Sequence, residues 1–392
     1  MGTTRRDITR TLQALRTAAA GCLFGTAMLL FVLGGCNRER SPSVASGAAA
    51  GYAYVTNNGD GTVSEFSRLG TGDLVFRHLF KCGAVDGPAG IAVDPSNRFV
   101  YVANEGDDRI YEFRVRSLDG ALIPIKGGSI GGQHGSRPLQ VVVGPHGDFA
   151  YVTNAGSKGV DGSISEYAID RGALKPLGIF RGAELRQPLG IAIAPSGKYV
   201  YVSDHEAGTI LAFEVEPSGA LKPLGGTPSL GVKTGSPQMV TVSPVDGFVY
   251  AVDGPQGVAG AFKIAVDGRL EFQNAYRVGV ATAEPYGIAV ATSGAGQFAY
   301  TGNRAIDTVS YFAMKHGVLT LVGQSPTGLG GPTGMTVDPT GHFLYVVNRD
   351  AATVAQFAIV PVSNGSALLV STVFNEDPAN ESSHPLYIAM TH

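Results

Sequence analysis

Short runs of alternating apolar and polar residues, separated by Gly, Pro, Asn and Asp, follow one another along most of this chain. Alternation with a period of two predicts strands, and the separating residues predict tight turns. A long amphipathic helix would need apolar residues spaced by three and four, and the runs do not show that spacing. The pattern therefore predicts an all-β fold.

The runs are organised into a repeat. A block that reads Pro-x-Gly-Ile-Ala-Val-Asp-Pro-x-Gly-x-Phe-Val-Tyr-Val-x-Asn returns at intervals of 45 to 50 residues. Its tyrosine marks seven copies, at Tyr54, Tyr101, Tyr151, Tyr201, Tyr250, Tyr300 and Tyr345. Strand-rich repeats of this length are typical of propeller blades. We predict a seven-bladed β-propeller of four-stranded antiparallel blades.

The two ends of the repeat region complement each other. Each complete copy supplies four strands, which we name A to D from the axis outward. The first copy begins at strand B, in residues 51–55, and the chain ends on a lone strand A, in residues 384–390. Pairing this last strand with the first blade would remove two sheet edges. We therefore predict that the C-terminal strand closes the ring.

Antiparallel order places the A–B and C–D turns on one face of the ring, which we name the turn face. The B–C and D–A loops lie on the other, which we name the loop face. The A–B turns are short and alike, whereas the loops of the loop face vary and carry most of the charge; the B–C loop at residues 155–162 is four residues longer than the others. Because variable loops on a rigid scaffold commonly carry binding sites, we expect the site on the loop face.

Some positions break the repeat, and these are candidates for function. Two residues after the proline that opens each blade, four copies have Gly and the other three have Gln140, Met239 and Tyr387. Glycine on the innermost strand lets neighbouring backbones approach the axis, so a larger side chain should point toward the channel mouth. We predict that these three residues line the channel and bind a ligand.

Charged residues stand next to the same prolines. Arg137, Glu284 and His384 directly precede the proline in three copies, and Arg186 lies two residues before it in a fourth. His134 lies in the loop that leads to the first of these. We take His134, Arg137, Glu284 and His384 as candidate catalytic residues and Arg186 as a candidate ligand-binding residue. The alternative is that all five are solvated loop residues without a common target.

The residue three after the repeated tyrosine is Asn or Asp in every copy. These residues are Asn57, Asn104, Asn154, Asp204, Asp253, Asn303 and Asn348. A ring of this kind could hold a metal, but we favour a structural role, because Asn and Asp commonly form Asx turns at strand ends.

One of these positions begins a trio, Asp204-His205-Glu206. The trio could form a base with orienting carboxylates or a cation site, and His205 is a candidate ligand-binding residue. The alternative is an exposed trio without function.

Composition argues against nucleic acid as a partner. The formal net charge is −3, and beyond the N-terminal leader 25 basic residues stand against 31 acidic ones, with no Lys or Arg cluster to neutralise phosphates.

Residues 127–131 match Gly-x-Ser-x-Gly, but a nucleophile elbow needs a helix after the strand. The sequence has no zinc, phosphate-loop or haem-attachment motif. We expect no cofactor and no metal site.

The N-terminus carries an export signal. Four arginines between residues 5 and 16 precede an apolar run from about residue 18 to residue 33, which is too short to span a membrane. The run ends on Leu33-Gly34-Gly35-Cys36, which resembles the bacterial lipobox, so we predict that Cys36 is lipidated. The alternative is an ordinary signal peptide with a chance cysteine. Residues 4–8 resemble an imperfect twin-arginine motif, which leaves the export route open.

The chain then has three predicted parts: a signal peptide at 1–36, a flexible tether at 37–50 and the propeller at 51–392. The partners would be a membrane, through the lipid anchor, and a small molecule or an envelope protein at the loop face. The protein would be located in the cell envelope, facing the periplasm or the cell exterior. Cys82 has no disulfide partner and is predicted to be a small buried residue.

The repeat block resembles the lactonase-type seven-bladed propellers, the family named for bacterial 6-phosphogluconolactonase. A clear copy runs over residues 188–202 and closes with Gly219-Ala220-Leu221-Lys222-Pro223-Leu224. The resemblance covers residues 51–392 and implies the propeller fold. It also implies hydrolysis of a sugar or organic-acid lactone at the channel mouth by His, Arg and carboxylate groups. Gluconolactonase-type propellers hold a channel Ca²⁺, but the inner strands here show no acidic set, so calcium is an unsupported alternative.

Two functions are open at this point. The first interpretation is a lipid-anchored ring that binds a ligand or a protein of the bacterial envelope, and the alternative is an extracytoplasmic lactone hydrolase. Export counts against the phosphorylated, cytoplasmic substrate for which the family is named. The fold does not decide between the two. A deep mouth at which Arg137, His134 or His384 meets an acid would favour the enzyme, and a scattered or apolar rim would favour binding.

Overall fold

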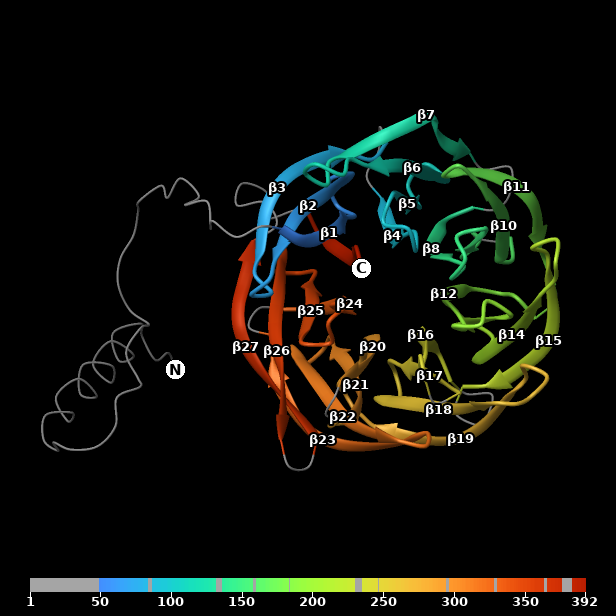
Figure 1. Ribbon diagram of the computed structural model, residues 1–392. Helices are drawn as coiled ribbons and strands as arrows, with labels where there is room; N and C mark the ends of the chain where they lie inside the picture. Colours follow the sequence, from blue (N-terminus) through green and yellow to red (C-terminus); the bar gives the residue numbers. More distant parts are fainter. Residues whose placement is uncertain are drawn as a thin grey trace, which may run out of the picture. The chain divides into compact units, whose positions relative to one another are not determined.

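The alternating runs fold as strands in this computed structural model, which describes residues 49–83, 87–131, 136–157, 160–182, 184–229, 235–245, 247–293, 296–327, 330–362, 365–375 and 383–392. Each regular element in these residues is a strand, and the strands form seven four-stranded antiparallel sheets. The sheets stand around a central axis, with strand A of each sheet innermost (Figure 1). The predicted seven-bladed propeller is therefore confirmed. No helix in the described residues is long and apolar enough to span a membrane.

Within each blade, strands A to D follow one another from the axis outward. Blade 1 contains β28 (Pro385–Met390), β1 (Ala49–Asn57), β2 (Thr62–Leu69) and β3 (Leu74–Lys81). Blade 2 contains β4 (Pro88–Val93), β5 (Phe99–Asn104), β6 (Arg109–Val115) and β7 (Leu122–Gly131). Blade 3 contains β8 (Pro138–Val143), β9 (Phe149–Asn154), β10 (Ser163–Asp170) and β11 (Ala173–Phe180). Blade 4 contains β12 (Pro188–Ile193), β13 (Tyr199–Asp204), β14 (Thr209–Val215) and β15 (Leu221–Pro228).

The remaining blades follow the same order. Blade 5 contains β16 (Pro237–Val242), β17 (Phe248–Asp253), β18 (Val258–Ile264) and β19 (Leu270–Arg277). Blade 6 contains β20 (Pro285–Ser293), β21 (Gly296–Asn303), β22 (Thr308–Lys315) and β23 (Val318–Pro326). Blade 7 contains β24 (Pro332–Val337), β25 (Phe343–Asn348), β26 (Thr353–Val362) and β27 (Gly365–Asn375).

Strand B is the buried centre of each blade. In β5, β9, β13, β17 and β25 the first residue is partly exposed and the other five are buried. Because these strands pack against a neighbouring blade on each face, their sequence is a continuous apolar run and does not alternate. The outermost strands, such as β3 and β15, are mostly exposed.

The repeated tyrosine joins neighbouring blades. The hydroxyl of Tyr54 donates to the backbone oxygen of Gly120, 2.7 Å away in the C–D turn of the following blade. The same bond joins Tyr101 to Gly172, Tyr151 to Gly219, Tyr201 to Gly268 and Tyr345 to Gly72. The last of these links blade 7 to blade 1. Gly268 has a φ of 84°, and a Cβ there would lie 2.2 Å from the Tyr199 ring, so the turn requires glycine.

The C-terminal strand closes the ring, as predicted. β28 pairs with β1 in antiparallel register. Beyond the strand, the Thr391 backbone N–H donates to Tyr52 O at 3.0 Å, and Thr391 Oγ1 accepts from Tyr52 N at 2.8 Å. Strand β1 begins at Ala49, two residues before the predicted propeller, because Ala49 pairs with Leu69.

A buried ion pair adds to the seam between blades 7 and 1. Arg68 on β2 lies 3.3 Å from Asp338 in the A–B turn of blade 7, and both side chains are almost fully buried. The same guanidinium donates to the backbone oxygen of Ala50 at 3.2 Å. Removing one partner would leave a buried charge uncompensated, so the pair fixes the position of the two blades.

Cys82 is buried and its thiol is free, as predicted. Burial raises the pKa of this thiol far above its usual value, so it stays protonated and unreactive. The predicted signal peptide with Cys36, most of the predicted tether and His134 lie outside the described residues.

Candidate functional site

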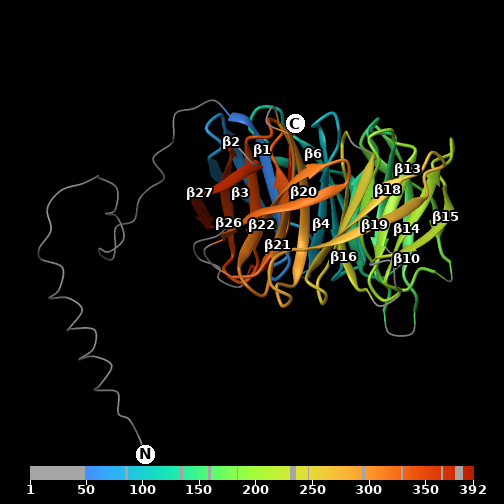
Figure 2. The ribbon, with the colours of Figure 1, turned by 90° about the horizontal axis from the view of Figure 1, so that it is seen from below.

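The loop face is built by one repeated backbone bond. In a blade, the residue directly after the Asn or Asp of that ring donates its backbone N–H to a carbonyl oxygen. This oxygen belongs to the residue directly before the proline that opens the same blade. Glu105 N thus donates to Gly87 O at 2.8 Å, and Arg304 N to Glu284 O at 3.1 Å. Two variable positions of each copy therefore meet around the channel mouth. The C-terminus lies at the opposite edge of the ring, on the turn face (Figure 2).

The ring of Asn and Asp residues is structural, as favoured from the sequence. The Asp204 carboxylate accepts the backbone N–H groups of Arg186 at 2.7 Å and Ala207 at 2.9 Å. Asn303 Nδ2 donates to Ser310 Oγ on strand C at 2.6 Å. In the part of the chain that the structure describes, no group of three or more His, Cys, Asp or Glu is placed to hold a metal ion.

Three inner-strand side chains meet across the channel. The hydroxyl oxygens of Tyr286 in β20 and Tyr387 in β28 lie 3.2 Å apart, and the Tyr387 hydroxyl lies 3.7 Å from Met239 Sδ in β16. The three strands belong to blades 6, 1 and 5, so the contacts of the Tyr387 hydroxyl cross the axis. We name these residues the channel floor. Burial raises the pKa of both hydroxyls, which are therefore protonated at neutral pH.

The charges of three side chains act on the Tyr286 hydroxyl of the channel floor. Burial raises the pKa of Tyr286, the positive charges of Arg304 and Arg349 act in the opposite direction, and Glu105 raises it. Arg349 Nε is buried and makes no hydrogen bond to the described residues. Each of the three charged residues directly follows an Asn of the ring in the sequence. Together with His205 of blade 4, which follows Asp204, we name them the mouth ring.

His205 presents a hydrogen-bond donor in the mouth ring. Its Nδ1 lies 3.3 Å from Gln238 Nε2, an amide nitrogen that only donates. When Gln238 Nε2 donates to Nδ1, the imidazole carries its proton on Nε2. The sequence trio does not act as a unit, because Asp204 is buried under the loop and Glu206 lies 4.0 Å from Arg186.

Glu105 connects the mouth ring to the rim of the loop face. Its Oε2 accepts from Arg137 Nη2 at 3.1 Å, and its Oε1 accepts from Asn58 Nδ2 at 3.3 Å. The Glu105 side chain is 24% exposed. A carboxylate has about four lone-pair sites, so both oxygens can still accept a proton from water.

A polar pocket of about 440 Å³ opens beside the mouth ring, between blades 3 and 4. We name it the rim pocket. It is lined by Arg137, Ala155, Gly156, Ser157, Val160, Asp161, Arg186, Gln187 and Glu206. The longer B–C loop of blade 3 supplies one of its walls.

Five of the residues singled out from the sequence lie at the loop face or in the channel beneath it. Arg137 and Arg186 line the rim pocket, and His205 stands in the mouth ring. Met239 and Tyr387 form part of the channel floor. The ion pair between Arg137 and Glu105 brings a candidate residue together with an acid, which the sequence analysis named as a feature that would favour an enzyme.

Three other candidates make no side-chain hydrogen bond or ion pair with this group in the described residues. Gln140 Oε1 is buried against Gly90 and makes no hydrogen bond to the described residues. The side chains of Glu284 and His384 are exposed and make no hydrogen bond or ion pair within the described residues. Their backbones are left-handed, with φ of 49° and 43°. His134 lies outside the described residues.

Sequence reasoning missed four residues of the site. Glu105, Arg304 and Arg349 share the position directly after the Asn ring, and Tyr286 directly follows its blade's proline. Reading the column after the Asn ring would have found the first three. Tyr286 had no such signal, because the residue after the proline varies in size and polarity among the copies.

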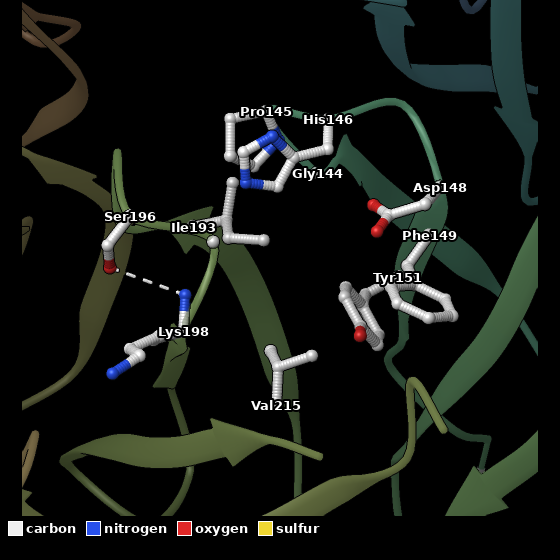
Figure 3. A pocket seen from close by; sticks show the side chains of 11 residues that line it. Gly144, Pro145, His146, Asp148, Phe149, Tyr151, Ile193, Ser196, Lys198 and Val215 are labelled. Atoms are coloured by element: carbon white, nitrogen blue, oxygen red, sulfur yellow. Dashed lines mark hydrogen bonds between the residues drawn. The ribbon is translucent and has the colours of Figure 1, made fainter. Parts of the chain in front are cut away.

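A smaller hollow of about 110 Å³ lies on the turn face, between blades 3 and 4. Figure 3 shows His146, Asp148 and Lys198 on different sides of this hollow, over a floor that includes Phe149 and Tyr151. Its polar groups do not converge on one point.

Comparisons with known proteins agree with the fold. The family profile described as "Lactonase, 7-bladed beta-propeller" matches residues 45–161, 135–234 and 279–375. A 6-phosphogluconolactonase from Bacillus subtilis is 25% identical over 336 residues, which cover 82% of this chain and 80% of that protein. One from Serratia proteamaculans is 24% identical over 46% of this chain and 55% of its own length.

A solved structure is similar over the whole ring. The periplasmic gluconolactonase of Pseudomonas aeruginosa superposes with a TM-score of 0.71 at 18% identity, over 87% of this chain and 99% of that one. At this identity the likeness concerns the fold alone. The family profile, however, matches most of the sequence, and the chain belongs to the lactonase family of seven-bladed β-propellers.

Proposed function

We propose that this protein is a lactone hydrolase whose active site is the mouth ring above the channel floor. The observation that carries the proposal is the contact of Tyr286 and Tyr387 across the channel, where the charges of Glu105, Arg304 and Arg349 act on the Tyr286 hydroxyl. Membership of the lactonase family and the relatives named 6-phosphogluconolactonase support this reading. They give no support to a module that only binds a ligand or an envelope protein.

The mouth ring supplies the groups that lactone hydrolysis needs. The reaction requires a base for water, positive charge for the oxyanion and a proton for the ring oxygen. Glu105 takes a proton from water, whose oxygen then bonds to the carbonyl carbon. Arg304 and Arg349 stabilise the oxyanion. The ring C–O bond breaks while the His205 Nε2–H group donates a hydrogen bond to the departing oxygen. The proton that Glu105 took from water passes to that oxygen, which gives the open hydroxy acid and returns Glu105 to its carboxylate. This assignment uses no resident metal or cofactor.

The test is hydrolysis of a panel of lactones by the purified chain, followed by acid release. Glu105→Gln and Arg349→Gln should each lower kcat/KM by about 100-fold, the cost of removing one base or one oxyanion donor. Matched controls are Glu271→Gln on the exposed side of β19 and Arg171→Gln, whose side chain is 92% exposed. Absence of turnover on every lactone, or variants as active as their controls, would overturn the proposal.

We also propose that the protein acts outside the cytoplasm as a lipid-anchored protein of the cell envelope, with a small molecule as its partner and no nucleic acid. The lipobox-like segment that ends at Cys36 supports this location. Metabolic labelling with a palmitate analogue should mark the wild-type chain and the control Cys82→Ser, and should fail for Cys36→Ser. Label on the last variant would contradict the anchor.

A further inference from the structure

The rim pocket lies beside the longer B–C loop of blade 3. Between β9 and β10 the B–C loop is four residues longer than in the other copies, and within it Ser157 and Val160 form an isolated β-bridge. Gly156 N donates to Ser136 O at 3.1 Å, which ties the loop to the segment before β8. The wall of the pocket is therefore built by an insertion that the propeller scaffold does not need.

The charges in and beside the rim pocket leave no surplus of positive charge. Arg137 pairs with Glu105 at 3.1 Å, and Arg186 lies 4.0 Å from Glu206. Asp161 adds a further carboxylate to the lining. Because every guanidinium has a carboxylate beside it, the pocket holds no surplus positive charge for a phosphate or a carboxylate ligand.

The lining is also unsuited to an apolar ligand. Small-molecule pockets are usually lined by apolar and aromatic side chains with few polar groups. Here the lining includes two guanidinium groups, two carboxylates, the Ser157 hydroxyl and the Gln187 amide, and its largest apolar side chain is that of Val160. Such a surface offers donors and acceptors together, which is what adjacent hydroxyl groups require. The spacing of 4.0 Å between Arg186 and Glu206 is loose enough for hydroxyls to bind to both.

The rim pocket is continuous with the mouth ring. Glu105 belongs to the mouth ring and bonds to Arg137 of the pocket. His205 of the mouth ring is followed in the chain by Glu206 of the pocket. A ligand with its lactone over the channel floor can thus extend over the junction of blades 3 and 4.

We propose that the rim pocket binds an uncharged second sugar unit, so that the substrate is a glycosylated aldonolactone such as a disaccharide lactone. This inference rests on the proposed function and names its substrate class. In the reaction, water adds to the lactone carbonyl carbon, the ring C–O bond breaks and the ring oxygen takes the proton. The glycosidic bond to the second sugar stays intact and serves only for binding.

The test compares two lactones that differ only by the second sugar: glucono-1,5-lactone and cellobiono-1,5-lactone. The wild-type chain should hydrolyse the disaccharide lactone with a kcat/KM about tenfold higher, which corresponds to about 1.4 kcal/mol of additional binding. Arg186→Gln and Asp161→Asn should remove that preference through KM, and they should leave hydrolysis of glucono-1,5-lactone unchanged. Arg171→Gln is the matched control outside the pocket.

The outcomes separate this inference from the proposed function. Equal kcat/KM for the two lactones, or a preference that survives both variants, would overturn the second-sugar pocket while hydrolysis itself stands. Faster turnover of 6-phosphoglucono-1,5-lactone than of either lactone would contradict the inference that the rim pocket has no surplus positive charge for a phosphate. If no lactone is hydrolysed, calorimetric titration with cellobionate decides: binding that Arg186→Gln abolishes would support the pocket, and no binding would overturn it.

Discussion

At the scale of single residues, part of the rim is held in a backbone conformation that favours glycine. Arg137, Glu284 and His384 have φ of 58°, 49° and 43°, and two other copies have Gly87 and Gly331 at the same position, also with positive φ. A residue with a Cβ costs roughly 1–2 kcal/mol in this region. Such strain concentrates at functional sites, which agrees with the position of these residues around the mouth.

Glycine at position 284 should relieve this strain. We expect Glu284→Gly to unfold with a free energy about 1 kcal/mol higher than that of Glu284→Ala, because only alanine keeps the Cβ. Urea denaturation measures the difference. At Glu271, on strand β19 and without a positive φ, the order should be reversed. Equal stabilities of the two variants at 284 would argue against strain there.

Glu65 on β2 is a buried carboxyl group. Its side chain is fully buried, and neither carboxyl oxygen has a hydrogen bond to any residue that the structure describes. Burial raises the pKa from 4.5 to about 7, and the charge of Asp119 acts in the same direction. The folded protein therefore holds this proton more tightly than the unfolded chain. The resulting stabilisation is complete below pH 4.5 and is lost as the pH rises through 7.

This proton gives a measurable dependence of stability on pH. Between about pH 5 and pH 8 the free energy of unfolding should fall by roughly 2–3 kcal/mol on account of Glu65. Glu112, whose pKa burial also raises to about 7, adds to the fall. In Glu65→Gln the fall should be smaller by the Glu65 share, whereas in the exposed control Glu271→Gln it should be unchanged. Urea denaturation at both pH values measures the fall. If the free energy of unfolding fell as much in Glu65→Gln as in the wild type, the Glu65 carboxyl would be ionised in the folded protein and the prediction would be wrong.

At the scale of elements, the tyrosine bond between blades is the repeated link. Tyr201→Phe removes the donor to Gly268 O and leaves a buried carbonyl unpaired, which should cost about 1–3 kcal/mol. Tyr199→Phe is the matched control, because its hydroxyl bonds to Val266 O at the exposed surface and should cost less than about 0.5 kcal/mol. Chemical denaturation measures both. Similar losses in the two variants would show that burial of the bond is not the cause.

The strands could be predicted from the sequence because the same pattern of strands and turns occurs in seven copies. Each copy carries the same apolar run for strand B and the same turn residues, so an ambiguous copy is read from the others. The start of the first strand at Ala49 was missed for a physical reason. Its pairing with Leu69 comes from a backbone ladder, and small residues such as alanine leave little pattern.

The site was predicted only in part, because it joins different blades. Met239 and Tyr387 broke a column of glycines, so the sequence pointed to them. Their contact depends on side chains that reach across the axis, and the bond between Tyr387 and Tyr286 joins residues 101 positions apart. Spacing within one copy carries no information on such a distance. Glu105 stands in a variable column that could have been read, but its pairing with Arg137 of the next blade could not be foreseen for the same reason.

At the scale of the whole molecule, one strand serves both the ring and the site. β28 pairs with β1 and closes blade 1. From the same strand, Tyr387 reaches Tyr286 and Met239 on the far side of the axis. An open ring would therefore lose the channel floor together with the last strand. Closure and assembly of the site are physically coupled.

Deletion of residues 384–392 tests this coupling. The truncated chain loses the β28 ladder and the burial of Tyr387, so it should lose several kcal/mol of stability and all lactone hydrolysis. Deletion of His392 alone, which is exposed and keeps the strand, is the matched control. A synthetic peptide of residues 383–392 added to the truncated chain should pair with β1 and restore the melting temperature and the activity together. A truncated chain that melts like the wild type would show that β28 does not hold the ring closed, and restored stability without activity would separate closure from the site.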